Sequence, residues 1–175
     1  MNASRSLLSM MAVMLLGSGS LAAAQENGPN PEAVQAVAAG QRPDANAAWW
    51  GFNAEDATDC LQAAIDSQAR TVVVPYMGVE WVIRPIQLRS NLELFFAPGV
   101  VVVAKKGAFK GKGDSLFSAR NLENITVRGY GAVLRMQKKD YQSSEYEKAE
   151  WRMGIDVISC KHIRIEGLRI ESTGG

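Results

Sequence analysis

Apolar and polar residues alternate most regularly in the last part of the printed sequence. Ile163 and Ile165 come before Gly167, and Leu168 and Ile170 come after it, with charged residues in between. Strict alternation is typical of a β-strand that buries one face. The two halves are separated by one glycine and carry no Asn-Gly or Asp-Gly hairpin signal, so the pattern predicts a corner rather than a reversal.

The same unit occurs once more, in the segment 121–134. Ile125 and Val127 stand 38 residues before Ile163 and Ile165, and a glycine follows each pair at the same distance. A strand–glycine–strand unit that recurs predicts layers that stack on one another, as in a solenoid.

Short β-branched and aromatic runs fill most of the chain between residues 71 and 134. They are separated by proline, glycine and asparagine turns, and hairpin signals are scarce. Upstream, Ala57, Leu61, Ala64 and Ile65 have helical spacing, which predicts an amphipathic helix from Asn53 to about residue 68. We therefore expect an all-β fold, a right-handed parallel β-helix, with this helix capping its N-terminal end.

Three segments resemble a known family. TDCLQAAIDSQARTVVVP, RPIQLRSNLELFFAPGVVV and ENITVRGYGAVL are similar to the N-terminal coils of the pectate-lyase-like superfamily, with the nearest likeness to polygalacturonase-type glycoside hydrolases. The resemblance covers residues 52–175 and implies a parallel β-helix. The family's Asn-Thr-Asp, Asp-Asp, His-Gly and Arg-x-Lys motifs do not occur, so no catalytic residue is assigned. We expect a C-terminally truncated piece of a longer protein, inactive by itself.

The chain divides into three parts. Residues 1–24 have the pattern of a signal peptide, with Arg5, an apolar run and an Ala-x-Ala cleavage site at 22–24. Residues 25–48 are rich in Asn, Pro and Ala and are predicted to be a linker or loose arm. Residues 49–175 form the β-helix domain. Export to the periplasm or the extracellular space follows from the signal peptide.

Composition limits the partners. The 175 residues are 47% hydrophobic and 21% charged, with a net charge of +1, which lacks the basic footprint of a nucleic-acid-binding protein. The apolar run near the N-terminus is too short to span a membrane. The expected partner is a polysaccharide, which Lys105, Lys106, Lys110 and Lys112 would attract if it were anionic, although solubilising a loop is the commoner role of such a cluster. The oligomeric state stays open.

One polar segment, residues 137–152, interrupts the strands and would project as a loop. Tyr146, Glu150, Trp151, Arg152 and Asp156 are the candidate substrate-binding residues, because aromatic rings can stack on sugars and charged groups can bind hydroxyls. The alternative is a solvated loop whose charges pair with one another and whose tryptophan packs it down.

No cofactor or metal site is evident, and calcium is expected only if the parent protein is a lyase. An oxidising compartment would permit a disulfide between Cys60 and Cys160, although two separate buried thiols are the favoured alternative.

The expected function is that of a secreted polysaccharide hydrolase of the polygalacturonase-like type. A lyase of the pectate-lyase-like type and a non-catalytic binding or adhesion protein are the two alternatives.

Overall fold

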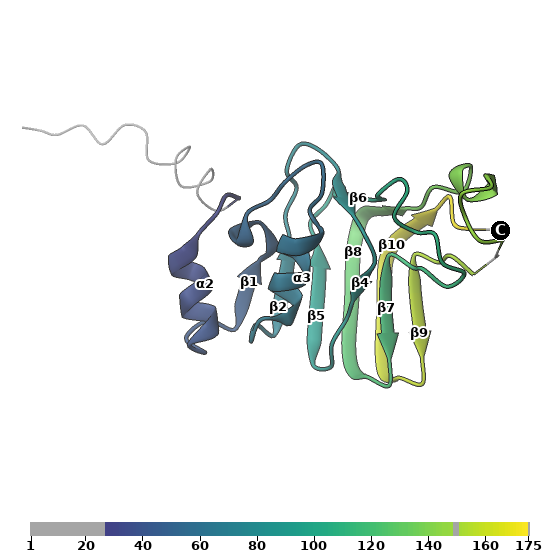
Figure 1. Ribbon diagram of the computed structural model, residues 1–175. Coiled ribbons are helices and arrows are strands. Elements are labelled where there is room, and N and C mark those ends of the chain that lie inside the picture. The colour runs from purple at the N-terminus through teal and green to yellow at the C-terminus, as the bar shows by residue number, and fades with distance from the viewer. Residues whose placement is uncertain (1–26, 149–150, 175) are drawn as a thin grey trace, which may run out of the picture.

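The computed structural model describes residues 27–148 and 151–174 (Figure 1). The predicted signal peptide, residues 1–24, lies outside the described residues. In the described part, two α-helices stand beside two parallel β-sheets, which together form a half-barrel (Figure 1).

Two α-helices lie at the N-terminal end. Helix α2 spans Pro31–Ala38; Asn30 caps it by accepting a hydrogen bond from the backbone N–H of Ala33 at 2.9 Å, and proline at the first position suits a helix start. Helix α3 spans Thr58–Asp66 and buries one face that includes Leu61 and Ile65. Two 3-10 helices complete the helical elements, η1 at Ala47–Trp50 and η2 at Asp140–Gln142.

The larger sheet has seven strands in the order β1-β2-β5-β8-β6-β3, with β10 also paired to β8. Its strands are β1 (Asp44–Asn46), β2 (Thr71–Val74), β3 (Trp81–Ile83), β5 (Leu92–Phe96), β6 (Val101–Ala104), β8 (Glu123–Arg135) and β10 (Lys161–Glu171). The smaller sheet has the order β4-β7-β9, with β4 at Ile86–Gln87, β7 at Phe117–Arg120 and β9 at Ile155–Ile158. Every pairing is parallel.

The expected fold class, an all-β right-handed parallel β-helix with a capping helix, was wrong. The structure is mixed α/β, because two helices pack beside parallel sheets that curve into a half-barrel. Strand β8 accounts for much of the difference. Its first half pairs with β5 and its second half with β6, so β5 and β6, which a turn separates along the chain, belong to one sheet. The predicted helix is also shorter than expected, beginning at Thr58.

The predicted correspondence between the two glycine-centred segments is confirmed. Ile163 pairs with Ile125 and Ile165 with Val127, in parallel register. The register shifts between Glu166 and Leu168, on either side of Gly167. The shift places a bulge or irregularity where the alternating pattern breaks, and beyond it the paired residues are 36 positions apart instead of 38, as Leu168 and Ala132 are.

Three polar residues turn the chain near the starts of β5, β8 and β10. Asn91, Asn124 and His162 all have positive φ, between 55° and 58°. The Asn124 amide donates to Asn91 Oδ1 at 2.9 Å, and Nδ1 of His162 lies 3.1 Å from Asn124 Oδ1. Asparagine tolerates this conformation better than most residues. His162 is therefore a turn residue in a stacked polar row.

The core lies between the two sheets. Phe96 from the larger sheet meets Phe117 from the smaller one, with ring centroids 5.7 Å apart. Residues 25–48 were expected to be a linker or loose arm, but the described part of this region is built into the domain. Strand β1 pairs with β2, and Val37, Ala45 and Ala47 are almost fully buried.

Candidate functional site

Two tyrosines stand out because their side chains are exposed on or beside the larger sheet. Tyr76, which follows β2 and Pro75, is 56% exposed, and Tyr130 in the middle of β8 is 64% exposed. Aromatic rings are usually more buried than this in a folded domain, so two exposed rings near one another are a candidate binding surface.

Glycines hold both rings in place. Gly99 and Gly167 have φ of 83° and 73°, a conformation that favours glycine. A Cβ atom at Gly99 would lie 3.6 Å from Cδ2 of Tyr76, and a Cβ atom at Gly167 would lie only 2.8 Å from Cγ of Tyr130. Each ring therefore covers a glycine of the neighbouring strand layer with one face. The phenol groups are left exposed to solvent.

The two tyrosines belong to one continuous edge of the molecule. Gly99 N–H donates to the carbonyl of Gly131 at 3.2 Å, and Gly131 directly follows Tyr130. We call Tyr76, Gly99, Tyr130, Gly131 and Gly167 the tyrosine edge. Tyr76 and Tyr130 are two strand layers apart, which corresponds to about 10 Å. That spacing is comparable with the length of a disaccharide.

Arginines in β8 lie on either side of Tyr130. On one side, Arg128 donates to Glu93 at 2.5 Å and stacks 4.4 Å from the centroid of Phe95. On the other side, Arg135 donates to Glu171 at 2.7 Å and to Glu80 at 2.8 Å.

The ion pair between Arg135 and Glu171 shifts the pKa of both groups. Hydrogen bonding to Glu171 raises the pKa of Arg135, although partial burial opposes the rise. The hydrogen bond from Arg135 lowers the pKa of Glu171, with a further contribution from Arg169. A carboxylate held in this way is suited to position an arginine and not to act as a proton donor.

Strand β10 repeats the arrangement around Gly167. Arg164 pairs with Glu166 at 2.8 Å, and Arg169 pairs with Glu171 at 3.0 Å. The side chains of the two arginines are 70% and 75% exposed. Four arginines thus flank the tyrosine edge, and four glutamates accompany them: Glu80, Glu93, Glu166 and Glu171. The edge is rich in hydrogen-bonding groups but balanced in charge.

The lysine cluster is also neutralised in large part. Lys105 pairs with Asp56 at 2.8 Å, Lys106 with Asp140 at 3.5 Å and Lys112 with Glu147 at 3.9 Å. Burial alone would raise the pKa of Asp56, but hydrogen bonds from Lys105 and Thr58 and the charge of Arg84 lower it well below its usual range. The cluster therefore provides less positive field than its sequence suggests.

The structure places the sequence-predicted site residues apart from the tyrosine edge. Tyr146 is 8% exposed, and its hydroxyl accepts a hydrogen bond from Gly107 N–H at 2.9 Å. Asp156 is 9% exposed and pairs with Arg120 at 2.6 Å. Trp151 is 65% exposed. Glu150 lies outside the described residues.

Arg152 is 1% exposed and is part of the interior. Its guanidinium donates to the carbonyls of Phe109, Lys110 and Glu147 at 2.7–3.0 Å. The Tyr141 ring lies 4.9 Å away and the Tyr146 ring 5.5 Å away. A ligand cannot reach this side chain. The expectation that Arg152, Tyr146 and Asp156 form a groove wall is thereby corrected, because all three side chains are used inside the fold.

Sequence reasoning missed Tyr76 and Tyr130. Their sequence context offered a signal. Tyr76 directly follows Pro75, and Tyr130 lies between two glycines, so neither belongs to the alternating apolar positions that form the core. Trp49, by contrast, is 8% exposed and packs into the domain.

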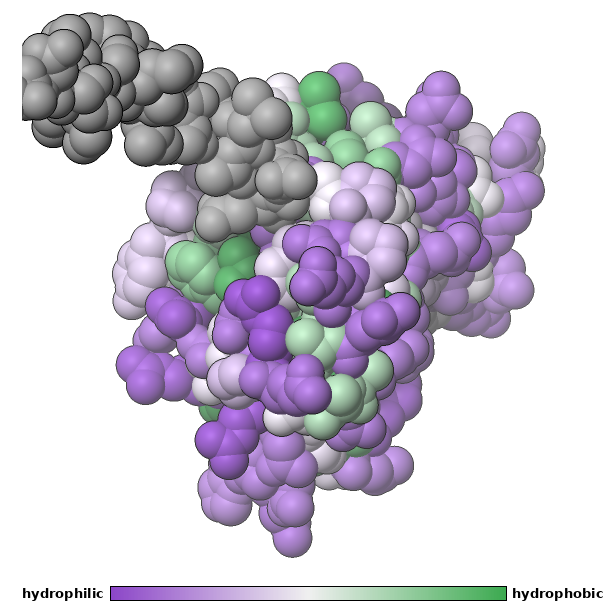
Figure 2. All heavy atoms as spheres, turned by 90° about the vertical axis from the view of Figure 1, so that its left-hand side faces the viewer, coloured by the Kyte–Doolittle hydropathy of each residue, from purple (hydrophilic) through white to green (hydrophobic). Residues whose placement is uncertain are grey.

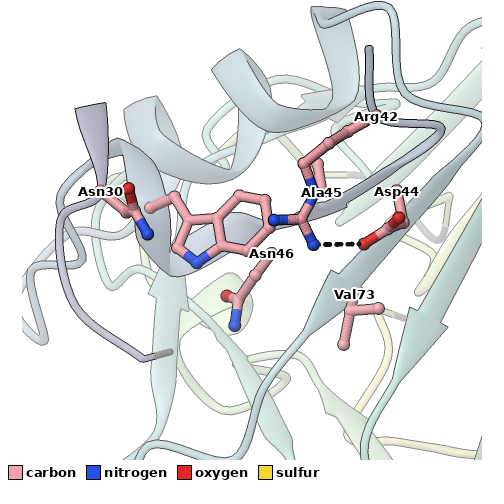
Figure 3. Close-up of a pocket in the computed structure, with 7 residues that line it drawn as sticks. Asn30, Arg42, Asp44, Ala45, Asn46 and Val73 are labelled. Carbon is pink, nitrogen blue, oxygen red and sulfur yellow. Dashed lines mark hydrogen bonds and ion pairs between the residues drawn. The ribbon is translucent and has the colours of Figure 1, made fainter. Parts of the chain in front are cut away.

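A small hollow of about 310 Å³ lies beside Trp49 (Figure 3). Arg42 lies 4.6 Å above the indole ring and pairs with Asp44 at 3.1 Å (Figure 3). Since Arg42 occupies the face that a sugar would need, this hollow is a weaker candidate than the tyrosine edge.

Cys60 and Cys160 are both free thiols. Burial raises the pKa of Cys60 to about 11. Cys160 lies near β7, with its sulfur 3.4 Å from the carbonyl oxygen of Ala119. Among the described residues, no three His, Cys, Asp or Glu side chains form a group that could hold a metal ion. The helices of residues 27–148 and 151–174 are all too short or too polar to cross a membrane.

Searches of protein-family models, of curated proteins and of solved structures give no match to this chain.

Proposed function

We propose that this chain is a carbohydrate-binding part of an exported protein and that it binds an extended polysaccharide along the tyrosine edge. The observation that carries the proposal is the pair of exposed tyrosines, each set over a glycine of the next strand layer and two layers apart. Rings held in this way lose little conformational entropy when a flat ligand stacks on them.

The charge balance of the edge defines the class of ligand. Each arginine at the edge already has a glutamate partner, so the remaining donors and acceptors suit the hydroxyl groups of neutral sugars. A polymer of uronates would gain little from a surface without net positive charge. We therefore propose a neutral polysaccharide, in place of the anionic one that the lysines suggested.

Affinity electrophoresis over a panel of polymers tests this choice. Native gels containing arabinoxylan, mixed-linkage glucan or galactan should retard the protein. Retardation should be nearly the same at about 50 mM and about 500 mM salt. Salt screens the attraction between charges but has little effect on the stacking of a sugar on an aromatic ring. Retardation only by polygalacturonate or alginate, and its loss in high salt, would contradict the proposal.

Cleavage of the bound polymer by the parent protein, as a glycoside hydrolase, is a second proposal that rests on the family resemblance alone. Release of reducing ends from the polymer that retards the protein would support hydrolysis. Unsaturated products that absorb in the ultraviolet would point to a lyase instead.

A further inference from the structure

A hollow of about 570 Å³ lies where β2, β5 and β8 begin. Thr71 of β2 pairs with Glu93 of β5, and Glu93 pairs with Thr126 of β8, so these three residues form one row across the sheet. Arg70, Asn91 and Asn124, which lie at or beside the strand starts, line the hollow together with this row. Its volume lies within the range of roughly 300–1,000 Å³ that is usual for small-molecule sites.

The guanidinium of Arg70 is the unusual group in this hollow. The backbone of Arg70 is fixed, because its N–H donates to the carbonyl of Pro43 at 2.6 Å and its carbonyl accepts from the N–H of Glu93 at 2.8 Å. Every other arginine in residues 27–148 and 151–174 donates to a carboxylate or to a backbone carbonyl. The Arg70 guanidinium has no such partner among these residues, so the fold leaves its charge without a direct counter-charge.

The carboxylates in the neighbouring strands are already paired. Glu93, the one acidic residue among the described residues that line the hollow, pairs with Arg128 at 2.5 Å. Asp44, in the adjacent strand β1, pairs with Arg42 at 3.1 Å. An anion from solution can therefore bind Arg70 without displacing an ion pair of the fold, and hydrogen bonds between ionised partners are the stronger kind.

Amide and hydroxyl groups lie around the same hollow. Asn91 and Asn124 both have positive φ, and the Asn124 amide donates to Asn91 Oδ1 at 2.9 Å. The oxygen of Asn91 is thus engaged, which leaves its NH2 group to donate to a ligand. The half-buried Thr126 hydroxyl can donate or accept. These groups suit a ligand that carries hydroxyl groups beside its negative charge.

The surface at the N-terminal end of the larger sheet is polar as well. Helix α2 lies beyond β1, the outermost strand of this sheet (Figure 1). Seen from that end, hydrophilic residues dominate the part outside the grey atoms, and apolar residues form small, separate patches (Figure 2). A ligand that binds near this end is therefore expected to be polar.

We propose that the hollow binds a small hydroxy acid, with the carboxylate on the Arg70 guanidinium and hydroxyl groups on Asn91 and Thr126. A planar guanidinium can form two parallel hydrogen bonds with a carboxylate. The site is separate from the tyrosine edge, because Arg70 precedes β2 and Tyr76 follows it, a separation of roughly 20 Å along an extended strand. It does not depend on carbohydrate binding at that edge.

Gluconate and sorbitol are matched probes, because sorbitol has a hydroxymethyl group in place of the carboxylate. In nitrogen–proton NMR spectra of the full chain, gluconate should shift the backbone amide signals of Thr71, Asn91 and Thr126. A titration to about 50 mM detects a dissociation constant as weak as roughly 10 mM. Sorbitol and sodium chloride at the same concentrations are the controls and should leave these signals in place.

Replacement of the arginine tests its role. Arg70→Gln should weaken gluconate binding at least about tenfold, because the charge and the planar fork are both lost. The midpoint of its urea unfolding should stay unchanged, since the guanidinium has no partner in the described part of the fold. Lys110→Gln removes the same charge at an exposed lysine of another loop and should bind gluconate like the wild type.

Gluconate shifts that Arg70→Gln removes and Lys110→Gln retains would support the site. The absence of shifts at the highest gluconate concentration would overturn it, and so would equal shifts with sorbitol or equal losses in the two variants. A lowered unfolding midpoint in Arg70→Gln would also overturn it, because the side chain would then serve the fold. Displacement of gluconate by an equal concentration of sulfate would indicate a general anion site and would overturn the assignment to a hydroxy acid.

Discussion

At the residue scale, Arg152 anchors the polar loop before β9 through hydrogen bonds to the backbone. Its guanidinium donates to three backbone carbonyls, and two tyrosine rings lie around it. Such a side chain is structural, even though its neighbours in sequence are polar and aromatic. The sequence could not reveal this, because arginine is mostly exposed and the three carbonyls come from elements 5 to 43 residues away.

Replacing Arg152 should therefore lower stability. Arg152→Ala removes a buried guanidinium that donates to three backbone carbonyls, and we expect a loss of about 3 kcal/mol in the free energy of unfolding, measured by urea denaturation. Trp151→Ala, at the exposed neighbour, is the matched control and should change it by less than about 0.5 kcal/mol. Equal stability of the two variants would refute the assigned role.

Asp56 has an acid-dependent role between Lys105 and Arg84. Its folded pKa is lowered below the ordinary value of 3.8, so its contribution is present above that value and is lost as the pH falls further. Asp56→Asn should be less stable than the wild type at pH 7. At about pH 2.5 the gap should narrow, because the carboxyl then binds a proton in the unfolded wild-type chain, which favours unfolding, while it stays charged in the folded protein. A difference in unfolding free energy that stays constant between these pH values would contradict this explanation.

Cys60 should be protected from modification in the folded protein. Burial raises its pKa to about 11, and the thiolate is the reactive form. We expect iodoacetamide at pH 8 to label Cys160 and to leave Cys60 unlabelled until denaturant is added, as mass spectrometry of tryptic peptides would record. Labelling of Cys60 at the rate of Cys160 would show that the α3 region opens readily.

At the element scale, the alternating pattern predicted strand pairing better than it predicted architecture. The match of Ile125 with Ile163 was recognisable because each residue recurs at the same place in a glycine-centred unit. The fold class was wrong because alternation specifies which face of a strand is buried and says nothing of which strands share a sheet. The pairing of β8 with both β5 and β6 depends on tertiary contacts, and so does the packing of α2.

The tyrosine edge could not be predicted from the sequence for a similar reason. Tyr76 and Tyr130 lie 54 positions apart and meet at one edge only through the stacking of β2, β5, β8 and β10. Nothing in the local sequence of either residue indicates the other. The polar loop was chosen instead because its aromatic and charged residues are close together in the chain, which is a poor guide to proximity in a parallel sheet.

Gly167 connects the corner geometry with the position of Tyr130. Gly167→Ala must adopt φ of 73° and place a Cβ atom 2.8 Å from the ring, so we expect a loss of roughly 1–3 kcal/mol in unfolding free energy. The ring must also move, which should weaken carbohydrate binding. Gly113→Ala, where nothing lies within 4 Å, is the control and should alter neither quantity.

At the scale of the whole molecule, the parallel stacking of strands sets the spacing of two tyrosine rings along one edge. The sheet supplies the spacing, the glycines supply room for the rings, and balanced arginine–glutamate pairs supply hydrogen bonds without net charge. The central claim is that a polysaccharide binds to this edge.

Isothermal titration with the polymer that retards the protein tests that claim most directly. The double variant Tyr76→Ala with Tyr130→Ala should bind at least roughly tenfold more weakly than the wild type while keeping its unfolding free energy, because both rings are exposed. Trp151→Ala removes an equally exposed ring beyond the end of β10, near Gly174, and should bind like the wild type. Unchanged affinity in the double variant, or a loss confined to Trp151→Ala, would contradict the account.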